Sequence, residues 1–287
     1  MPKKPVPFGI DTIIKRIYNL PMEIIYILKQ TDNYKIVNEI LKNEFNISSR
    51  LRLKLINNQS ITLNGKTCST KENVQNNDEI KVSFNYEEDN SNILPTKMNL
   101  KIVYEDEWLL VVNKPAGIAV HPSILHFEDS LSNGIKFYYD SINLKKKIRP
   151  VNRLDKNTSG LVVFAKCEYI QEQLIKQMQQ NVFKKEYLAL VTGHLDNKKR
   201  KIDLPIARKK DSIIERCIDE KGQASVTHYE VIHEYENYSL VKCILETGRT
   251  HQIRVHFQAI RTSLTSEIAY MVVLLHLLVD KLYTVVA

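Results

Sequence analysis

The chain has 287 residues, with 41 Lys and Arg against 33 Asp and Glu, which gives a formal charge of +8. This length suits about two domains, and the basic balance favours a polyanionic partner. Its 8 glycines form neither a P-loop nor a dinucleotide fingerprint, and its 4 cysteines have no paired spacing. We therefore expect no nucleotide cofactor, no zinc or redox motif, and reduced thiols in a cytoplasmic protein.

Neither a membrane segment nor a metal site is expected. The apolar stretch 268–279 is shorter than the about 20 residues that a spanning helix needs. The N-terminus lacks the apolar run of a secretory signal. His251 and His256 have no Cys or carboxylate partners at ligand spacing, so the sequence predicts no bound metal.

The first part of the chain indicates a small α+β unit over residues 21–86, preceded by a lead, 1–20, without an assigned role. Its expected elements are a strand at 24–28, helices at 34–42 and 48–57, the second capped by Ser48 or Ser49, and strands at 61–63 and 79–84.

The helix at 48–57 is basic. Arg50, Arg52 and Lys54 are side chains of the kind that, in a nucleic-acid-binding unit, contact phosphates and raise affinity without reading sequence. The other interpretation of this helix is a solvated charged face, because charge runs are often no more than that.

Residues 87–99 are polar and acidic at their start, which is typical of an interdomain linker. Beyond them, residues 100–260 indicate an α+β domain around a mixed, mainly antiparallel sheet. Its expected strands are 101–104, 109–113, 161–165, 186–191, 227–232 and 239–245, with a helix at 168–180. The strand at 161–165 is apolar throughout, as in a strand buried on both faces.

The most informative segment is residues 150–160, PVNRLDKNTSG, just ahead of that buried strand. In an extended chain Arg153 and Asp155 share one side, and Leu154 takes the other. A carboxylate held at the edge of a rigid core has the fixed geometry that catalysis requires. A structural ion pair that caps the strand would show the same spacing.

Five blocks in order resemble the motifs of RluA-type pseudouridine synthases. The segment at 150–160 is similar to the family's signature motif, and the resemblance extends from Leu100 to Ile260. The other blocks are VYED with VNKPAGI and HPS at 103–123, KEYLALVTG at 185–193, PIAR with GQASVT at 205–227, and ETGRTHQIRVH at 246–256.

The resemblance implies an isomerase that needs no cofactor. The uracil glycosidic bond breaks, the base turns while held, and C5 joins C1′ of the sugar. Asp155 would be the essential carboxylate, either as nucleophile on the sugar or as base at C2′. Arg249 would hold Asp155 ionised, and Tyr187 would pack on the uracil and help to remove the C5 proton.

Uridine in a stem must be flipped out to reach such a carboxylate. Arg153 would fill the vacated space, and Ile253 would form either a pocket wall or plain core. The unit at 21–86 is similar to the small RNA-binding domain shared with ribosomal protein S-four. The implied partner is ribosomal RNA, in particular 23S ribosomal RNA, or transfer RNA, bound by a monomer.

The sequence departs from the family's pattern at Asn152, where many members have His, and we expect little effect there. After Ile260 the family's Gly-x-Pro and Gly-Asp-x-x-Tyr-Gly blocks are absent from residues 261–287. The hypothesis is a frameshifted tail, although two different frames are required. Resequencing the gene tests it.

Two functions of different classes follow. The first is an RNA pseudouridine synthase, and the second is a catalytically impaired RNA-binding protein left by an altered C-terminus. A carboxylate glycoside hydrolase would need two opposed acids, and no second acid stands in an equally marked context.

Overall fold

The computed structural model describes residues 21–124, 126–180, 182, 184–212 and 214–260, and the backbone of 264–268. The lead at 1–20, and the tail at 261–287 apart from 264–268, lie outside the described residues. The frameshift hypothesis therefore falls almost entirely outside them. Within the described residues, no helix is long and apolar enough to cross a bilayer.

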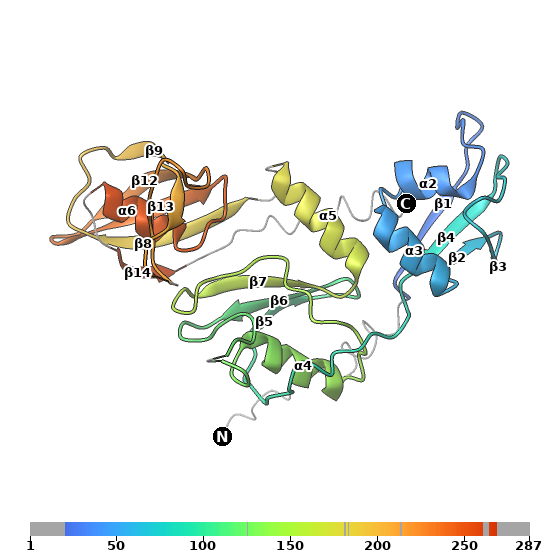
Figure 1. Ribbon diagram of the computed structural model, residues 1–287, viewed down its shortest axis with the longest axis horizontal. Coiled ribbons are helices and arrows are strands. Elements are labelled where there is room, and N and C mark those ends of the chain that lie inside the picture. Colours follow the sequence, from blue (N-terminus) through green and yellow to red (C-terminus); the bar gives the residue numbers. More distant parts are fainter. Residues whose placement is uncertain are drawn as a thin grey trace, which may run out of the picture.

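The chain folds into three bodies around a central helix, α5 (Glu168–Gln179) (Figure 1). The first contains β1 (Glu23–Ile27), α2 (Val37–Asn43), α3 (Ser49–Asn57), β2 (Ile61–Leu63), β3 (Lys66–Thr67) and β4 (Glu79–Ser83). The second contains β5 (Ile102–Glu105), β6 (Leu109–Lys114), α4 (Leu131–Ser141) and β7 (Gly160–Ala165). The third contains β8 (Lys185–Thr192), β9 (Lys199–Asp203), β10 (Ile206–Arg208), β11 (Arg216–Ile218), β12 (Val226–Glu234), β13 (Tyr238–Leu245), α6 (Gln252–Ala259) and β14 (Leu264–Ile268).

The strand pairings of the described sheets are antiparallel. The sheet orders are β1-β4-β2-β3, β5-β6-β7, β14-β8-β13-β12-β9 and the hairpin β10-β11. The expected α+β fold with a mainly antiparallel sheet is confirmed. The sequence predicted one sheet for residues 100–260, whereas the structure contains separate three-stranded and five-stranded sheets.

The first body follows its sequence pattern closely. Ser48 caps α3, its Oγ accepting a hydrogen bond from the backbone N–H of Leu51 at 3.2 Å. Helix α2 begins at Val37 rather than at residue 34, because the backbone just before it pairs with the segment at 72–74.

Strand β7 is buried on both faces, as its continuous apolar run predicts. Val163 and Ala165 pack into the core that also contains α2, α3 and β4. Val162 and Phe164 pack into a second core against α4. The end of β7 that carries the 150–160 segment is therefore anchored between two cores.

The acidic segment at 87–99 has no helix or strand, as expected, but its start is docked rather than solvated. The Glu88 side chain is 3% exposed and accepts from Arg149 Nη2 at 2.5 Å and from Lys54 Nζ at 2.7 Å. Lys146 Nζ donates to the carbonyls of Phe84 and Tyr86. These contacts tie the first body to the loop ahead of β7.

Candidate active site

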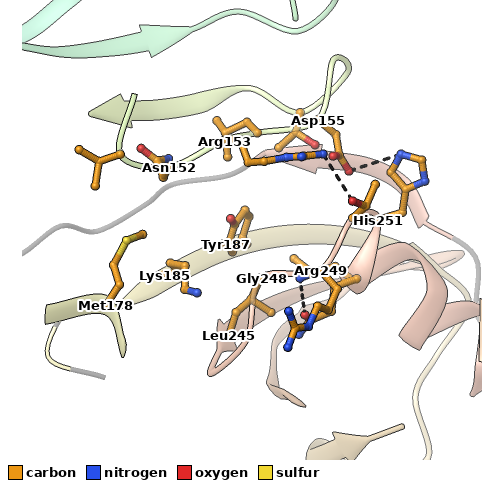
Figure 2. Close-up of a pocket in the computed structure, with 16 residues that line it drawn as sticks. Asn152, Arg153, Asp155, Met178, Lys185, Tyr187, Leu245, Gly248, Arg249 and His251 are labelled. Carbon is orange, nitrogen blue, oxygen red and sulfur yellow. Dashed lines mark hydrogen bonds and ion pairs between the residues drawn. The ribbon is translucent and has the colours of Figure 1, made fainter. Parts of the chain in front are cut away.

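A pocket of about 220 Å³ lies between the loop preceding β7 and the β8–β13 sheet (Figure 2). It brings together five of the residues singled out in the sequence. Arg153 and Asp155 come from the β7 loop, Tyr187 from β8, and Arg249 and Ile253 from the loop and helix after β13. Residues 100 positions apart in the sequence, Arg153 and Ile253, thus line one cavity.

Asp155 is positioned by a buried lysine at the end of β6. Lys114 is fully buried, and its Nζ donates to the carbonyls of Pro115 at 2.9 Å, Ile118 at 2.8 Å and Lys156 at 3.0 Å. Burial lowers the pKa of Lys114 to about 8, although the charge of Asp155 opposes that shift. This lysine fixes the backbone immediately after Asp155.

Among the described residues, the basic side chain that comes within pairing distance of the Asp155 carboxylate is a histidine rather than an arginine. His251 Nε2 lies 3.9 Å from Asp155 Oδ2. His251 has a left-handed backbone, with φ of 58°, a conformation that costs about 1–3 kcal/mol in a non-glycine residue. Such strain at a pocket wall is typical of a functional position.

Arg153 lies beside Asp155 and is exposed. Its Nη2 is 3.4 Å from Thr250 Oγ1 across the pocket, a long contact that joins the β7 loop to the loop after β13. Leu154 turns into the second core. The alternation expected for this segment is confirmed, because the two charged side chains line the pocket and the leucine is buried.

Tyr187 and Lys185 lie two positions apart on β8 and both line the pocket. Tyr187 also packs against the second and third cores, so its ring is held on two sides. Burial lowers the pKa of Lys185, and the nearby charge of Arg249 adds to that effect.

Arg249 points away from Asp155 in the pocket (Figure 2). Its Nε donates to the carbonyl of Ala224 at 3.2 Å. Among the described residues, no ion pair joins Arg249 to Asp155. Their expected partnership stays a prediction, and it would require the guanidinium to move.

Gln252 was not singled out in the sequence, yet it organises this loop. Its Oε1 accepts from Thr247 Oγ1 at 2.8 Å and from the Arg249 N–H at 2.9 Å. Its Nε2 donates to the Val226 carbonyl at 2.9 Å and to Thr227 Oγ1 at 3.0 Å. All four hydrogen-bonding positions of a buried amide are satisfied, which fixes the Arg249 backbone.

The structure also shows the contacts of two further positions that the sequence analysis discussed, Ile253 and Asn152. Ile253 is 5% exposed and belongs both to the pocket lining and to the third core, so the two interpretations of it coexist. Asn152 Nδ2 donates to the Leu161 carbonyl at 3.0 Å, and its Oδ1 accepts from the Val163 N–H at 2.9 Å. Asparagine at this position therefore pins the loop to β7.

The predicted phosphate-binding residues of α3 differ in their surroundings. Arg50 is exposed. Arg52 donates to the Ile47 carbonyl at 3.0 Å and to Ser49 Oγ at 2.8 Å. Lys54 forms ion pairs with Glu88 and Glu168 at 2.7 and 2.8 Å, so its charge is engaged inside the protein.

Comparison with known proteins shows the family. Residues 108–259 match the family described as RNA pseudouridylate synthase. A Bacillus subtilis protein named RNA pseudouridine synthase YhcT is 35% identical over 233 residues, which cover 80% of this chain and 77% of that one. The Escherichia coli ribosomal large subunit pseudouridine synthase D is 34% identical over 236 residues, covering 82% of this chain and 72% of that one.

The chain therefore belongs to the RNA pseudouridylate synthase family, whose members isomerise uridine in RNA. The expected enzyme class is confirmed. The solved structure of human RNA pseudouridylate synthase domain containing 1 is similar with a TM-score of 0.50 at 23% identity, covering 60% of this chain and 76% of that one. That likeness supports the fold alone.

Proposed function

We propose that this protein converts specific uridines of structured RNA to pseudouridine, with Asp155 as the essential carboxylate. The observation that carries the proposal is the pocket in which Asp155, Tyr187 and Arg153 meet. Its volume of about 220 Å³ is below the about 300–1,000 Å³ typical of pockets for drug-sized ligands. This size favours a ligand no larger than one nucleoside.

The acid content of the pocket argues for an isomerase over a glycoside hydrolase. Asp155 is the one carboxylate among its lining residues, all of which lie in the described part of the chain. Hydrolysis by the usual route needs a second acid on the opposite side of the sugar. An isomerase that rejoins the base to the same sugar requires no such partner.

The positions of the surrounding residues support one role for each of them. Arg153 is exposed beside Asp155 and would enter the stack when the uridine leaves it, at a cost of a few kcal/mol for flipping. Tyr187 offers a ring face at the pocket wall, and Ile253 closes the apolar side. Arg249 would pair with Asp155 once the nucleotide is bound.

The target that we propose is ribosomal RNA of the large subunit, with transfer RNA as the second candidate. Support comes from relatives in Escherichia coli and Neisseria meningitidis named ribosomal large subunit pseudouridine synthase D. The unit at 21–86 would serve as an RNA-binding domain, with Arg50 and Arg52 as its phosphate contacts. We propose a monomer that acts in the cytoplasm.

Tritium release from C5-labelled RNA tests the function. Unmodified ribosomal and transfer RNA are offered to the purified protein and to Asp155→Asn. We expect release with the wild type and a loss of at least about 100-fold in the variant, because this carboxylate performs an essential chemical step.

Asp140→Asn is the matched control. Asp140 is a surface carboxylate on α4 that pairs with Lys136 and is absent from the pocket lining. The control should keep wild-type release. If folded wild-type protein binds RNA yet releases no tritium from either substrate, the result supports a catalytically impaired RNA-binding protein.

A further inference from the structure

A second hollow, which we call the hairpin groove, adjoins the active-site pocket. It measures about 370 Å³ and shares Gly248, Arg249 and Thr250 with that pocket. Its other walls are the β10–β11 hairpin and the turn before β12. The remaining lining residues are Ile206, Ala207, Arg208, Arg216, Lys221, Gly222 and Gln223. The groove and the site that would hold the uridine therefore share one wall, formed by these three residues.

The groove is lined by cations and by no carboxylate. Arg208, Arg216, Lys221 and Arg249 are the charged members of its lining, all within the described part of the chain. These side chains come from three separate segments, the hairpin, the 219–222 turn and the loop after β13. Their convergence on one hollow is a product of the fold.

Two of these cations face each other across the hairpin. Arg208 and Arg216 are direct cross-strand partners, and like charges at such positions are destabilising. The acidic residue nearest along the hairpin, Glu215, is engaged by Lys209 Nζ at 2.6 Å. A bound anion would relieve the repulsion between the two arginines.

The wall of the groove is fixed by a glycine. A Cβ on Gly222 would lie 2.5 Å from the carbonyl carbon of Ile206, closer than real Cβ atoms approach. Ile206 and Gln223 exchange two backbone hydrogen bonds of 2.9 Å each. Only glycine lets the turn approach β10 this closely, and the same turn contributes Lys221 to the lining of the groove.

We propose that the hairpin groove binds backbone phosphates of the RNA next to the flipped uridine. The proposal rests on the proposed function for the path of the RNA chain. If the uridine lies at Asp155, the adjoining RNA backbone would pass Arg249 and enter the groove. Phosphate contacts of this kind set register and affinity without reading bases. Arginine is suited to them because its planar fork binds phosphate through two hydrogen bonds.

The test is the salt dependence of RNA binding by Arg208→Gln/Arg216→Gln. Binding is measured with an unmodified 23S ribosomal RNA transcript, in the Asp155→Asn background so that no reaction occurs. Each lost phosphate contact lowers the slope of log K against log salt by about 0.7–0.9. We expect the slope to fall by roughly 1.5 and the affinity by at least about 10-fold at low salt.

Two further variants make the result specific. Arg208→Lys/Arg216→Lys keeps both charges, and its slope should stay near that of the parent. Lys97→Gln/Lys101→Gln removes two exposed charges that do not line the groove, and its slope should change by less than half as much. An unchanged slope in the glutamine variant, or an equal loss in the Lys97/Lys101 control, overturns the groove proposal.

The outcome is independent of catalysis. If the wild type releases no tritium but the arginine variant loses its salt slope, the proposed function fails and the groove remains an RNA-binding surface. If tritium is released and the slope is unchanged, the function stands and the groove proposal is wrong.

Discussion

At the scale of single residues, Tyr187 could contribute to the reaction through its hydroxyl group or through the face of its ring, and substitutions distinguish the two. Its ring is held between two cores at the pocket wall. If the hydroxyl helps to remove the C5 proton, Tyr187→Phe should lower kcat by about 100-fold or more with little change in KM. Tyr187→Leu should in addition raise KM, because it removes the ring face. Initial rates of tritium release over a range of RNA concentrations measure both kcat and KM.

Tyr238→Phe is the control for this pair, since Tyr238 is a half-exposed tyrosine on the neighbouring strand β13 and does not line the pocket. Its kinetics should equal those of the wild type. Full activity in Tyr187→Phe would restrict Tyr187 to packing and remove it from proton transfer.

The site residues that the sequence predicted are those to which the family motifs assign a chemical role. The pocket contains three of them, Asp155, Tyr187 and Arg249. The supporting residues escaped notice for physical reasons. Lys114 is the last residue of an apolar strand, and that position is the one feature of the sequence that indicates a buried charge. Two partners of Gln252 lie 25 and 26 residues earlier and the other two lie in its own loop, so its hydrogen bonds depend on the tertiary fold.

At the scale of elements, the connector between the first body and β7 depends on one buried carboxylate. Burial opposes ionisation of Glu88, but hydrogen bonds from Arg149 and Lys54 outweigh it and lower its pKa to about 2. A depressed carboxylate pKa stabilises the fold above the ordinary value of about 4.3. That contribution is lost as the pH falls from there toward 2.

We predict that Glu88→Gln costs about 3 kcal/mol of unfolding free energy at pH 7, because it leaves Arg149 with a much weaker partner. The difference between wild type and variant should shrink as the pH falls through this window. Urea unfolding at several pH values measures it. Glu87→Gln is the adjacent control, since Glu87 is exposed and, within the described part of the chain, its ion pair is with Lys145, and its cost should be near zero. A pH-independent difference for Glu88→Gln would contradict the assignment.

Elements were predictable where hydrophobic periodicity was strong, as in β7 and α5, and not where short or polar segments depend on tertiary pairing. Helix α4 contains Gly134, a poor helix former; a Cβ there would lie 2.8 Å from the Met98 sulfur, so a larger residue would need the Met98 side chain to shift. The β10–β11 hairpin is short, and its strands carry charged residues. These two strands form because they pair with each other, and neither has a sequence pattern that would predict a strand alone.

At the scale of the whole molecule, the first body and the β5–β7 sheet share one continuous core. Phe84, the residue after β4, stacks on Tyr169 of α5 with ring centroids 5.2 Å apart and meets Trp108 edge-on at 6.1 Å. Buried residues of α2, α3 and β4 belong to the same cluster as those of β6, β7 and α5. The sequence indicated two units joined by a polar segment, since inter-unit packing of aromatic residues leaves no periodic signal.

This shared core predicts that the two units unfold together, and the chain contains its own probe. Trp108 is its single tryptophan, 7% exposed and next to Phe84. Phe45 lies within the first body, 1% exposed and packed on Tyr26. Phe45→Ala should cost about 3–5 kcal/mol and should lower the Trp108 fluorescence midpoint in urea as much as the far-ultraviolet circular dichroism midpoint. If the first body unfolds independently, Phe45→Ala will leave the Trp108 transition at its wild-type midpoint and split the circular dichroism curve, and the shared core will not be a cooperative unit.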